Sequence, residues 1–390
     1  MIKRLLGLFA AALLSATSLP AQCGVTGDTI FVQTYDDLWA LNSCDSIWGS
    51  LHIQNWDFSH LDSLQNLVWI EEHFIIDQCT SLLNVGGLSN LLEVGGNLMI
   101  RNNFTLQGLT GFSSINVLGG DLIIKGNITL VNVNGFSNLE QISGDLKLQE
   151  NHTLEGLGGL QNVSQVGGDV LIEGQNIVLD DLSGLASLNQ ILGDLLIALP
   201  SGTSLDGLEA LQTIGGDLSV TNMLILGNID GLQGLQHVGG NCELGFNGSL
   251  VQIDGFSNLS SVGGDLYIHD NASLFFCCGI EPIIAAGGVD GQIILADNTN
   301  GCNSEEAILL ACADNLTSES DVPVYWSVTD GMLKVAATVP SSIKIFDTFG
   351  RIIYSKGQYT KEECRIALQP GIYILWMDGL THAERVLIPH

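Results

Sequence analysis

Six aspartates recur at one position about every 24 residues, and they are the side chains best placed to do chemistry. They are Asp121, Asp145, Asp169, Asp194, Asp217 and Asp265, with Asn97 and Asn241 at the same position in two further copies. Carboxylates stacked at a strand spacing of about 4.8 Å repel one another, and calcium bound by their oxygens would offset that repulsion. Alternatively, each Asp, which follows a glycine, caps its own turn. The Gly-Gly-x-Gly-x-Asp calcium repeat is absent, so the pattern favours capping and predicts no cofactor, with calcium as the alternative.

Catalysis is not expected. Acidic residues are abundant, so a carboxylate pair for glycoside hydrolysis can always be chosen. However, the copies are nearly uniform, and Arg101, Lys125 and Lys147 are the only basic residues between positions 23 and 321. The histidines are scattered over different repeat positions, and no nucleophile turn or phosphate loop lies in a suitable context. A carbohydrate-active β-helix enzyme is therefore the third hypothesis for function.

The nine cysteines predict disulfides if the chain is exported. Six lie toward the two ends of the repeats: Cys23 and Cys44 at the first end, and Cys277, Cys278, Cys302 and Cys312 at the second, where two bonds with open pairing are expected. Cys79 and Cys242 lie seven copies apart, on the order of 34 Å at the strand spacing, whereas a disulfide needs Cα atoms within roughly 7 Å. These two cannot pair. No Cys-x-x-Cys occurs, so zinc is not expected.

The elements that position these residues come from an internal repeat of about 24 residues. Its units begin at Gly49, Glu72, Gly96, Gly120, Gly144, Gly168, Gly193, Gly216, Gly240 and Gly264. Leu122 and Ile124 alternate as on the inward face of a short strand, and later apolar residues fall at every third position, which suits tight 3₁₀-like turns. One unit cannot bury its apolar side alone, so the units must stack. The pattern predicts a mostly β solenoid of about ten coils.

An asparagine recurs at one turn position of the repeat. The residues are Asn103, Asn127, Asn151, Asn247, Asn271 and Asn298. Stacked Asn side chains can bond backbone groups of the adjacent coil, which predicts a buried ladder. Several of these residues lie in Asn-x-Ser/Thr triplets, so N-glycosylation is the alternative interpretation.

One outward strand position indicates binding. Its residues are Ile75, Met99, Ile123, Lys147, Leu171, Leu196, Ser219, Glu243 and Tyr267, with Arg101 and Lys125 beside them. About half are apolar where a solvent-facing strand residue is usually polar. A ligand-binding face is one interpretation. The other is that β-branched residues simply favour strands, or that the N-terminal segment covers them.

The repeat resembles the receptor L-domain type of leucine-rich repeat, the β-helical module of insulin-receptor-like and EGF-receptor-like ectodomains. The string from Cys44 to Ile53 is similar to that module's first coil, and the strings from Leu274 to Cys278 and from Ile293 to Asn298, followed by Cys302 and Cys312, are similar to its end. The resemblance covers residues 44–312 and implies a right-handed β-helix whose sheet carries recognition. The array is longer and more uniform than in the receptors, so signalling is not implied.

The chain's two ends indicate export. Residues 1–21 have a positive start, a short apolar run and a Ser18-Leu19-Pro20-Ala21 cleavage region, which together predict a signal peptide. No later run is long enough to span a membrane. Residues 23–321 carry a net charge of −33, which makes nucleic acid an improbable partner, whereas residues 322–390 carry +1. This change places a domain boundary near residue 322.

Residues 333–390 have short alternating runs between turns, which predict a small Ig-like β-sandwich. The string from Ile343 to Ser355, followed by Leu368-Gln369-Pro370-Gly371-Ile372-Tyr373, resembles the C-terminal sorting domain of the bacterial type IX secretion system. That resemblance implies an address read by the secretion machinery and then removed.

The expected organisation is a signal peptide (1–21), an N-terminal cap (22–48), the solenoid with its cysteine cap (49–312), a linker (313–332) and the sorting domain (333–390). We expect a secreted or cell-surface binding and adhesion protein, exported across both membranes, that engages a protein or glycan through the solenoid sheet. A structural component of a surface layer or matrix is the alternative.

Overall fold

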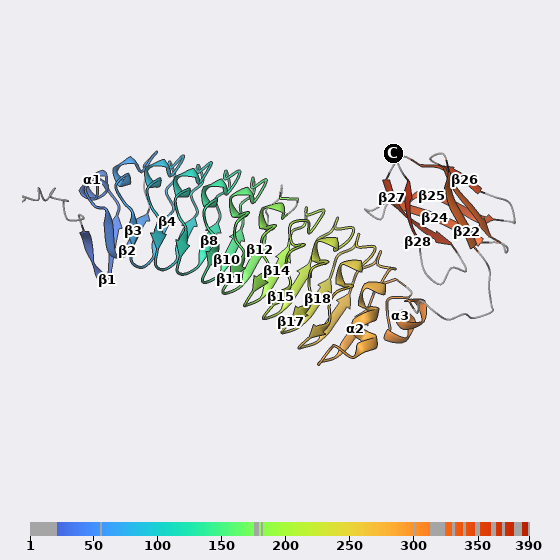
Figure 1. Ribbon diagram of the computed structural model, residues 1–390. Helices are drawn as coiled ribbons and strands as arrows, with labels where there is room; N and C mark the ends of the chain where they lie inside the picture. Colours follow the sequence, from blue (N-terminus) through green and yellow to red (C-terminus); the bar gives the residue numbers. More distant parts are fainter. Residues whose placement is uncertain are drawn as a thin grey trace, which may run out of the picture.

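The computed structural model describes residues 22–54, 57–174, 179–180, 182–299 and 301–312, and seven strands between residues 324 and 388 with Leu368. The predicted signal peptide lies outside these residues. The first part is a parallel solenoid, and the second comprises two antiparallel sheets (Figure 1). Among the described residues, no helix has the length and apolar character needed to cross a membrane.

One strand per coil forms the main face of the solenoid. These strands are β2 (Ser46–Gln54), β4 (Phe74–Asp77), β6 (Leu98–Arg101), β8 (Leu122–Lys125), β10 (Leu146–Gln149), β12 (Val170–Glu173), β14 (Leu195–Ala198), β16 (Leu218–Thr221), β18 (Cys242–Gly245), β20 (Leu266–His269) and β21 (Ile293–Ala296). All pair in parallel, and Leu146 lies between Leu122 and Val170. The repeat inferred from the sequence is therefore the structural coil.

A second, shorter strand precedes each main strand from β4 to β20. These are β3 (Trp69–Ile70), β5 (Glu93–Val94), β7 (Val117–Leu118), β9 (Gln141–Ile142), β11 (Gln165–Val166), β13 (Gln190–Ile191), β15 (Thr213–Ile214), β17 (His237–Val238) and β19 (Ser261–Val262). They also pair in parallel from coil to coil.

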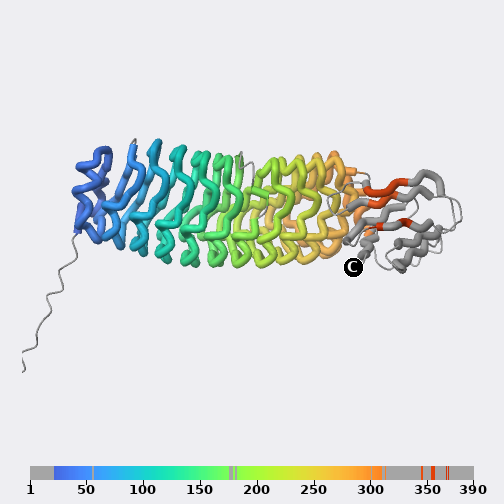
Figure 2. The backbone as a smooth tube through the Cα atoms, turned by 90° about the horizontal axis from the view of Figure 1, so that it is seen from above, coloured from blue at the N-terminus to red at the C-terminus, as the bar shows by residue number. Residues whose placement is uncertain are grey.

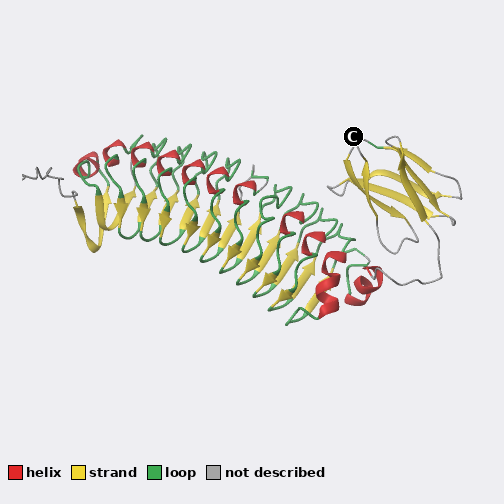
Figure 3. Ribbon diagram, in the orientation of Figure 1, coloured by secondary structure: helices red, strands yellow, loops and turns green. Residues whose placement is uncertain are grey.

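Single 3₁₀ turns close the coils on the side opposite the strands (Figure 3). They are η1 (Asp62–Leu64), η2 (Gly86–Leu88), η3 (Thr110–Phe112), η4 (Asn134–Phe136), η5 (Gly158–Leu160), η6 (Ser183–Leu185), η7 (Asp230–Leu232), η8 (Asp254–Phe256) and η9 (Cys278–Ile280). The three-residue spacing of apolar side chains suits this geometry, because residues i and i+3 of a 3₁₀ turn eclipse one another.

The core is one continuous column inside the coils, which follow one another in a single row (Figure 2). It extends from Val32 to Ile308, and the strand residues Leu122 and Ile124 are fully buried in it. Phe112 and Phe136 stack face to face in successive coils, with ring centroids 5.6 Å apart. Each coil thus completes the core of its neighbours, as a solenoid requires.

Coil spacing at the 3₁₀ turns depends on glycine. A Cβ atom on Gly135 would lie 1.8 Å from the carbonyl oxygen of Leu109 in the preceding coil. Gly111 and Gly159 meet the preceding coil in the same way. A side chain at this position would push two backbones apart, so the coils can stack this closely only because the residue is glycine.

Disulfides lie at both ends of the solenoid. At the first end, β1 (Gln22–Val32) pairs with β2, helix α1 (Tyr35–Ala40) follows, and Cys23 is bonded to Cys44. At the second end lie helices α2 (Glu281–Ala286) and α3 (Glu305–Cys312). The bonds there join Cys277 to Cys302 and Cys278 to Cys312. Cys79 and Cys242 are buried in the core and belong to none of these bonds.

The C-terminal part contains two antiparallel sheets. One is built from β22 (Val324–Thr329), β23 (Met332–Ala337) and β26 (Cys364–Ala367), and the other from β24 (Ser341–Asp347), β25 (Ile352–Tyr359), β27 (Gly371–Met377) and β28 (Glu384–Ile388). Strand β22 lies within the segment expected to be a linker (313–332), and it pairs along its whole length with β23.

Candidate functional site

The outward face of the main sheet carries three columns of side chains, because every second residue of a strand points away from the core. The entry column is Asn97, Asp121, Asp145, Asp169, Asp194, Asp217, Asn241 and Asp265. The middle column is Ile75, Met99, Ile123, Lys147, Leu171, Leu196, Ser219, Glu243 and Tyr267. The exit column is Asp77, Arg101, Lys125, Gln149, Glu173, Ala198, Thr221, Gly245 and His269.

The entry column links the coils by hydrogen bonds. The backbone N–H of Asp145 donates to Oδ1 of Asp121 at 2.9 Å, and that of Asp169 donates to Oδ1 of Asp145 at 2.8 Å. The same bond continues through the column to Gln292, whose N–H donates to Asp265. We predicted that each Asp caps its own turn. The prediction was wrong in the partner, because the carboxylate accepts from the next coil.

These hydrogen bonds give the carboxylates a structural role that does not require a bound cation. Asn97 and Asn241 make the same bond with an amide oxygen, so the ladder depends on an acceptor rather than on charge. Within the described ranges, no group of three His, Cys, Asp or Glu side chains is arranged to hold a metal ion.

The buried asparagines form a second ladder on the inner side of the turn. The Oδ1 atom of Asn127 accepts from the N–H of Asn103, and its Nδ2 donates to the carbonyl of Ile100 at 2.8 Å. In the same triplet, the hydroxyl of Thr129 donates to two carbonyls of the preceding coil. Asn127 is fully buried, so the Asn-x-Thr pattern is explained by packing between coils, and this asparagine is closed to glycosylation in the folded chain.

The first half of the middle column is an apolar stripe. Ile75, Met99 and Ile123 lie side by side on neighbouring strands, as do Leu171 and Leu196, and all five are half-buried. Lys147 interrupts the stripe, and its ammonium lies 2.6 Å from Oδ2 of Asp145. Burial alone would raise the pKa of Asp145, but the bonds from Lys147 and from the Asp169 N–H outweigh it and lower that pKa.

The basic side chains that we predicted beside the middle column form ion pairs with acids of the solenoid. The guanidinium of Arg101 lies 3.0 Å from Asp77, and the ammonium of Lys125 lies 3.4 Å from Glu150. With Lys147, all three basic side chains of the solenoid therefore have carboxylate partners.

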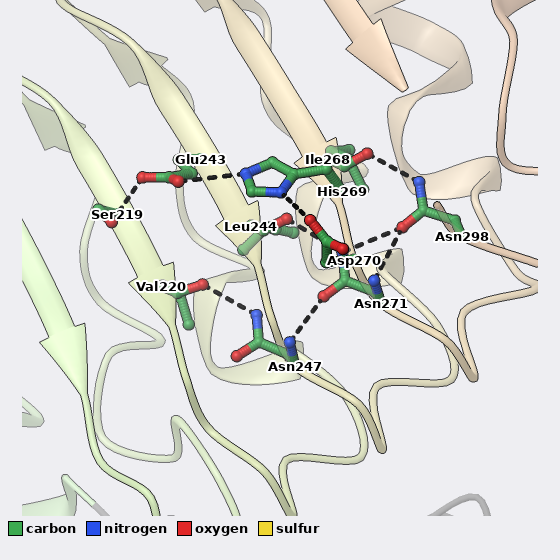
Figure 4. A network of polar contacts seen from close by, with 10 residues as sticks. All are labelled: Ser219, Val220, Glu243, Leu244, Asn247, Ile268, His269, Asp270, Asn271 and Asn298. Atoms are coloured by element: carbon green, nitrogen blue, oxygen red, sulfur yellow. Dashed lines mark hydrogen bonds and ion pairs between the residues drawn. The ribbon is translucent and has the colours of Figure 1, made fainter. Parts of the chain in front are cut away.

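The second half of the face is polar and contains a network that sequence reasoning missed (Figure 4). The Ser219 hydroxyl donates to Oε2 of Glu243 at 2.9 Å, and Oε1 of Glu243 lies 3.2 Å from Nε2 of His269. The other ring nitrogen of His269 lies 2.9 Å from Asp270. Three neighbouring strands, β16, β18 and β20, thus hold one chain of polar contacts.

A glycine makes this network possible. A Cβ atom on Gly245 would lie 2.7 Å from the His269 ring, so the imidazole occupies the space where other coils have an exit-column side chain. Phe246 packs edge-on against the same ring, with centroids 5.2 Å apart. Gly245 was the available sequence signal, since it is the one glycine in the exit column defined above.

A shallow hollow of about 330 Å³ lies beside this network. It is lined by Asp217, Leu218, Ser219, Asn241, Glu243, Tyr267 and His269. At its edge, the Tyr267 hydroxyl donates to Oδ2 of Asp265 at 2.6 Å. This bond lowers the pKa of Asp265 and raises the pKa of Tyr267.

This network does not contain a Ser–His pair of the kind that activates a serine nucleophile. The hydroxyl of Ser219 donates to Glu243, and the imidazole of His269 contacts Glu243 and Asp270 instead of Ser219. Burial lowers the pKa of His269, but its bonds to Asp270 and Glu243 outweigh burial and raise it. Both ring nitrogens face carboxylate oxygens, which only accept hydrogen bonds, so His269, Glu243 and Asp270 are arranged as a salt bridge.

Of the predicted site residues, the structure brings Ile75, Met99 and Ile123 together, and Leu171 with Leu196. It places Tyr267 beside the hollow, and it pairs Arg101, Lys125 and Lys147 with acidic side chains.

No family model matches this chain, and no curated protein matches it in sequence.

Proposed function

We propose that the chain is an exported, non-catalytic binding and adhesion protein that engages a protein or glycan through the outward face of the main sheet. The observation that carries the proposal is the apolar stripe, in which Ile75, Met99 and Ile123 remain partly exposed on adjacent strands. A contiguous row of partly exposed apolar side chains on an outward sheet face is a candidate interaction surface.

The described N-terminal segment does not cover this stripe. Residues of β1 pair edge to edge with β2 as an additional strand, so they extend the sheet instead of folding across it. Strand propensity alone also explains the stripe poorly, because Met99, Leu171 and Leu196 are not β-branched.

Export is supported by the signal-like residues 1–21 and by three disulfides, which persist in oxidising compartments. The resemblance of residues 44–312 to receptor L-domains supports recognition on the sheet. The resemblance of the C-terminal strings to the type IX sorting domain, an Ig-like sandwich, supports delivery to the cell surface through that machinery.

The test is a capture experiment with the full mature chain against extracellular protein extract and a glycan array, with and without calcium. Saturable capture that is lost in an Ile123→Asp/Leu171→Asp variant of unchanged melting temperature is expected. The matched control is Gln141→Asp/Gln190→Asp, which adds the same charge on the short strands β9 and β13. Capture that survives the first variant, cation-driven self-assembly in place of capture, or turnover of a glycan would overturn the proposal.

A further inference from the structure

The hollow lies where the apolar stripe ends. Leu196 on β14 is the last apolar residue of the stripe, and Ser219 on β16 is its direct neighbour across the strand pair. The short Ser219 side chain leaves space that Tyr267 bounds two strands further along the sheet. A ligand lying across the strands would therefore pass directly from the stripe into the hollow.

Hydrogen-bond donors in the wall of the hollow are directed at acids of the protein itself. The Ser219 hydroxyl donates to Glu243, the Tyr267 hydroxyl donates to Asp265, and Nδ2 of Asn241 donates to Asp217 at 3.5 Å. Protonated His269 donates to Glu243 and Asp270. A carboxylate has about four acceptor sites, so these acids keep acceptor capacity for a ligand.

The charge of the wall of the hollow is negative, so it also favours a cationic ligand. Asp217 and Glu243 line the hollow and Asp265 lies beside it, with His269 as the one cationic group in the lining. The His269 imidazolium also forms an ion pair with Asp270, which lies outside the lining of the hollow. A ligand group must therefore bring several donors and positive charge, which an ammonium or guanidinium does and a sugar hydroxyl, with a single donor, does not.

We propose that the hollow formed by Asp217, Ser219, Asn241, Glu243, Tyr267 and His269 binds a lysine or arginine side chain of a protein partner. Apolar residues of the same partner segment pack on the stripe at Leu196 and Leu171. The ligand class is thus a basic, amphipathic polypeptide. This inference rests on the proposed function of the sheet face and narrows its ligand to protein.

The experiment uses the full mature chain and two synthetic tripeptides, acetyl-Leu-Arg-Leu-amide and the same peptide with citrulline, the neutral isostere of arginine. Titration calorimetry at low salt gives the two dissociation constants. The arginine peptide is expected to bind about tenfold more tightly, because hydrogen bonds to charged groups are roughly twice as strong as neutral ones.

The pocket variant is Glu243→Gln, and its control is Glu140→Gln, which removes one charge at an exposed position in the turn before β9. Glu243→Gln is expected to weaken the arginine peptide about tenfold and the citrulline peptide little, whereas Glu140→Gln leaves both within about twofold. A Tyr267→Phe variant, which keeps the ring and frees Asp265, is expected to retain binding.

Equal binding of the two peptides would show that the positive charge is not recognised, and equal losses in the two glutamine variants would attribute binding to the overall charge of the chain. Either result would overturn the pocket assignment. That result is separable from failure of the proposed function. Capture that disappears in Ile123→Asp/Leu171→Asp while the peptides do not discriminate would retain the sheet face and reject the pocket.

Discussion

The backbone N–H of Asp145 donates to Oδ1 of Asp121 at 2.9 Å, and this single contact is repeated between coils along the solenoid. It joins strand entries that are 24 residues apart, and it requires an acceptor oxygen at each of them. Asp supplies that oxygen in most coils and Asn supplies it in two, so the ladder explains the recurring acceptor, and the face is acidic only where the acceptor is Asp.

Two substitutions of Asp121 distinguish the effect of its hydrogen-bond acceptor on stability from the effect of its charge. Asp121→Ala removes the acceptor for the Asp145 N–H and is expected to lower the free energy of unfolding by about 0.5–1.5 kcal/mol. Asp121→Asn keeps the oxygen, as Asn97 does in the preceding coil, and is expected to change stability little. Chemical denaturation measures both. Equal losses, or a calcium-dependent rise in melting temperature that Asp121→Asn abolishes, would contradict the ladder.

Alanine substitutions at two glycines of successive coils test whether close coil spacing requires glycine at the 3₁₀ turn. Gly135→Ala places a Cβ atom against the Leu109 carbonyl and is expected to destabilise the fold by about 1–3 kcal/mol or more. Gly156→Ala meets no atom within 4 Å and is expected to be neutral or to stabilise slightly, because alanine restricts the unfolded chain. Thermal and denaturant melts compare them, and similar effects of the two would argue against the tight turn.

The salt bridge of His269 predicts a pH dependence. Burial opposes the charged imidazole, but Asp270 and Glu243 raise the pKa of His269 above 6.5. Its stabilising contribution is thus fully present below about pH 6.5 and is lost as the pH rises through the folded-state pKa. His269→Gln is expected to lower the melting temperature by a few degrees near pH 5.5 and by less near pH 9. A larger loss at the alkaline pH would refute the pairing.

The two core cysteines predict a pattern of thiol reactivity. Burial, with a smaller effect of Glu243, raises the pKa of Cys242, and Cys79 is equally buried. An alkylating reagent without reductant is therefore expected to label Cys79 and Cys242 only after denaturation. Peptide mapping by mass spectrometry identifies the labelled residues. A Cys79–Cys242 crosslink would contradict the observed register of the coils.

Much of the scaffold could be predicted because its rules are local and repeated. The alternation of Leu122 and Ile124 indicated an inward strand face, and a recurring turn asparagine had to satisfy backbone groups if it was buried. The alternation is seen in β8, and the bonds of Asn127 confirm the ladder.

The remaining features depend on contacts between coils. A repeated Asp does not reveal whether its oxygen meets its own turn or the next coil, so the partner of Asp121 was assigned wrongly. The hollow required the space at Gly245 to be matched with the ring of His269 across a strand pair. Both residues occupy ordinary repeat positions when each is considered alone. The pairing of the four C-terminal cap cysteines was open for the same reason.

Hydroxyl-radical footprinting of the full mature chain, with and without its captured ligand, measures whether the outward sheet face is the recognition surface. Met99 and Tyr267 are oxidisable residues of the middle column, and Trp39 in α1, which is 68% exposed, is the control. The ligand is expected to slow oxidation of Met99 and Tyr267 and to leave that of Trp39 unchanged. Protection of Trp39 with no protection of the middle column would contradict this prediction.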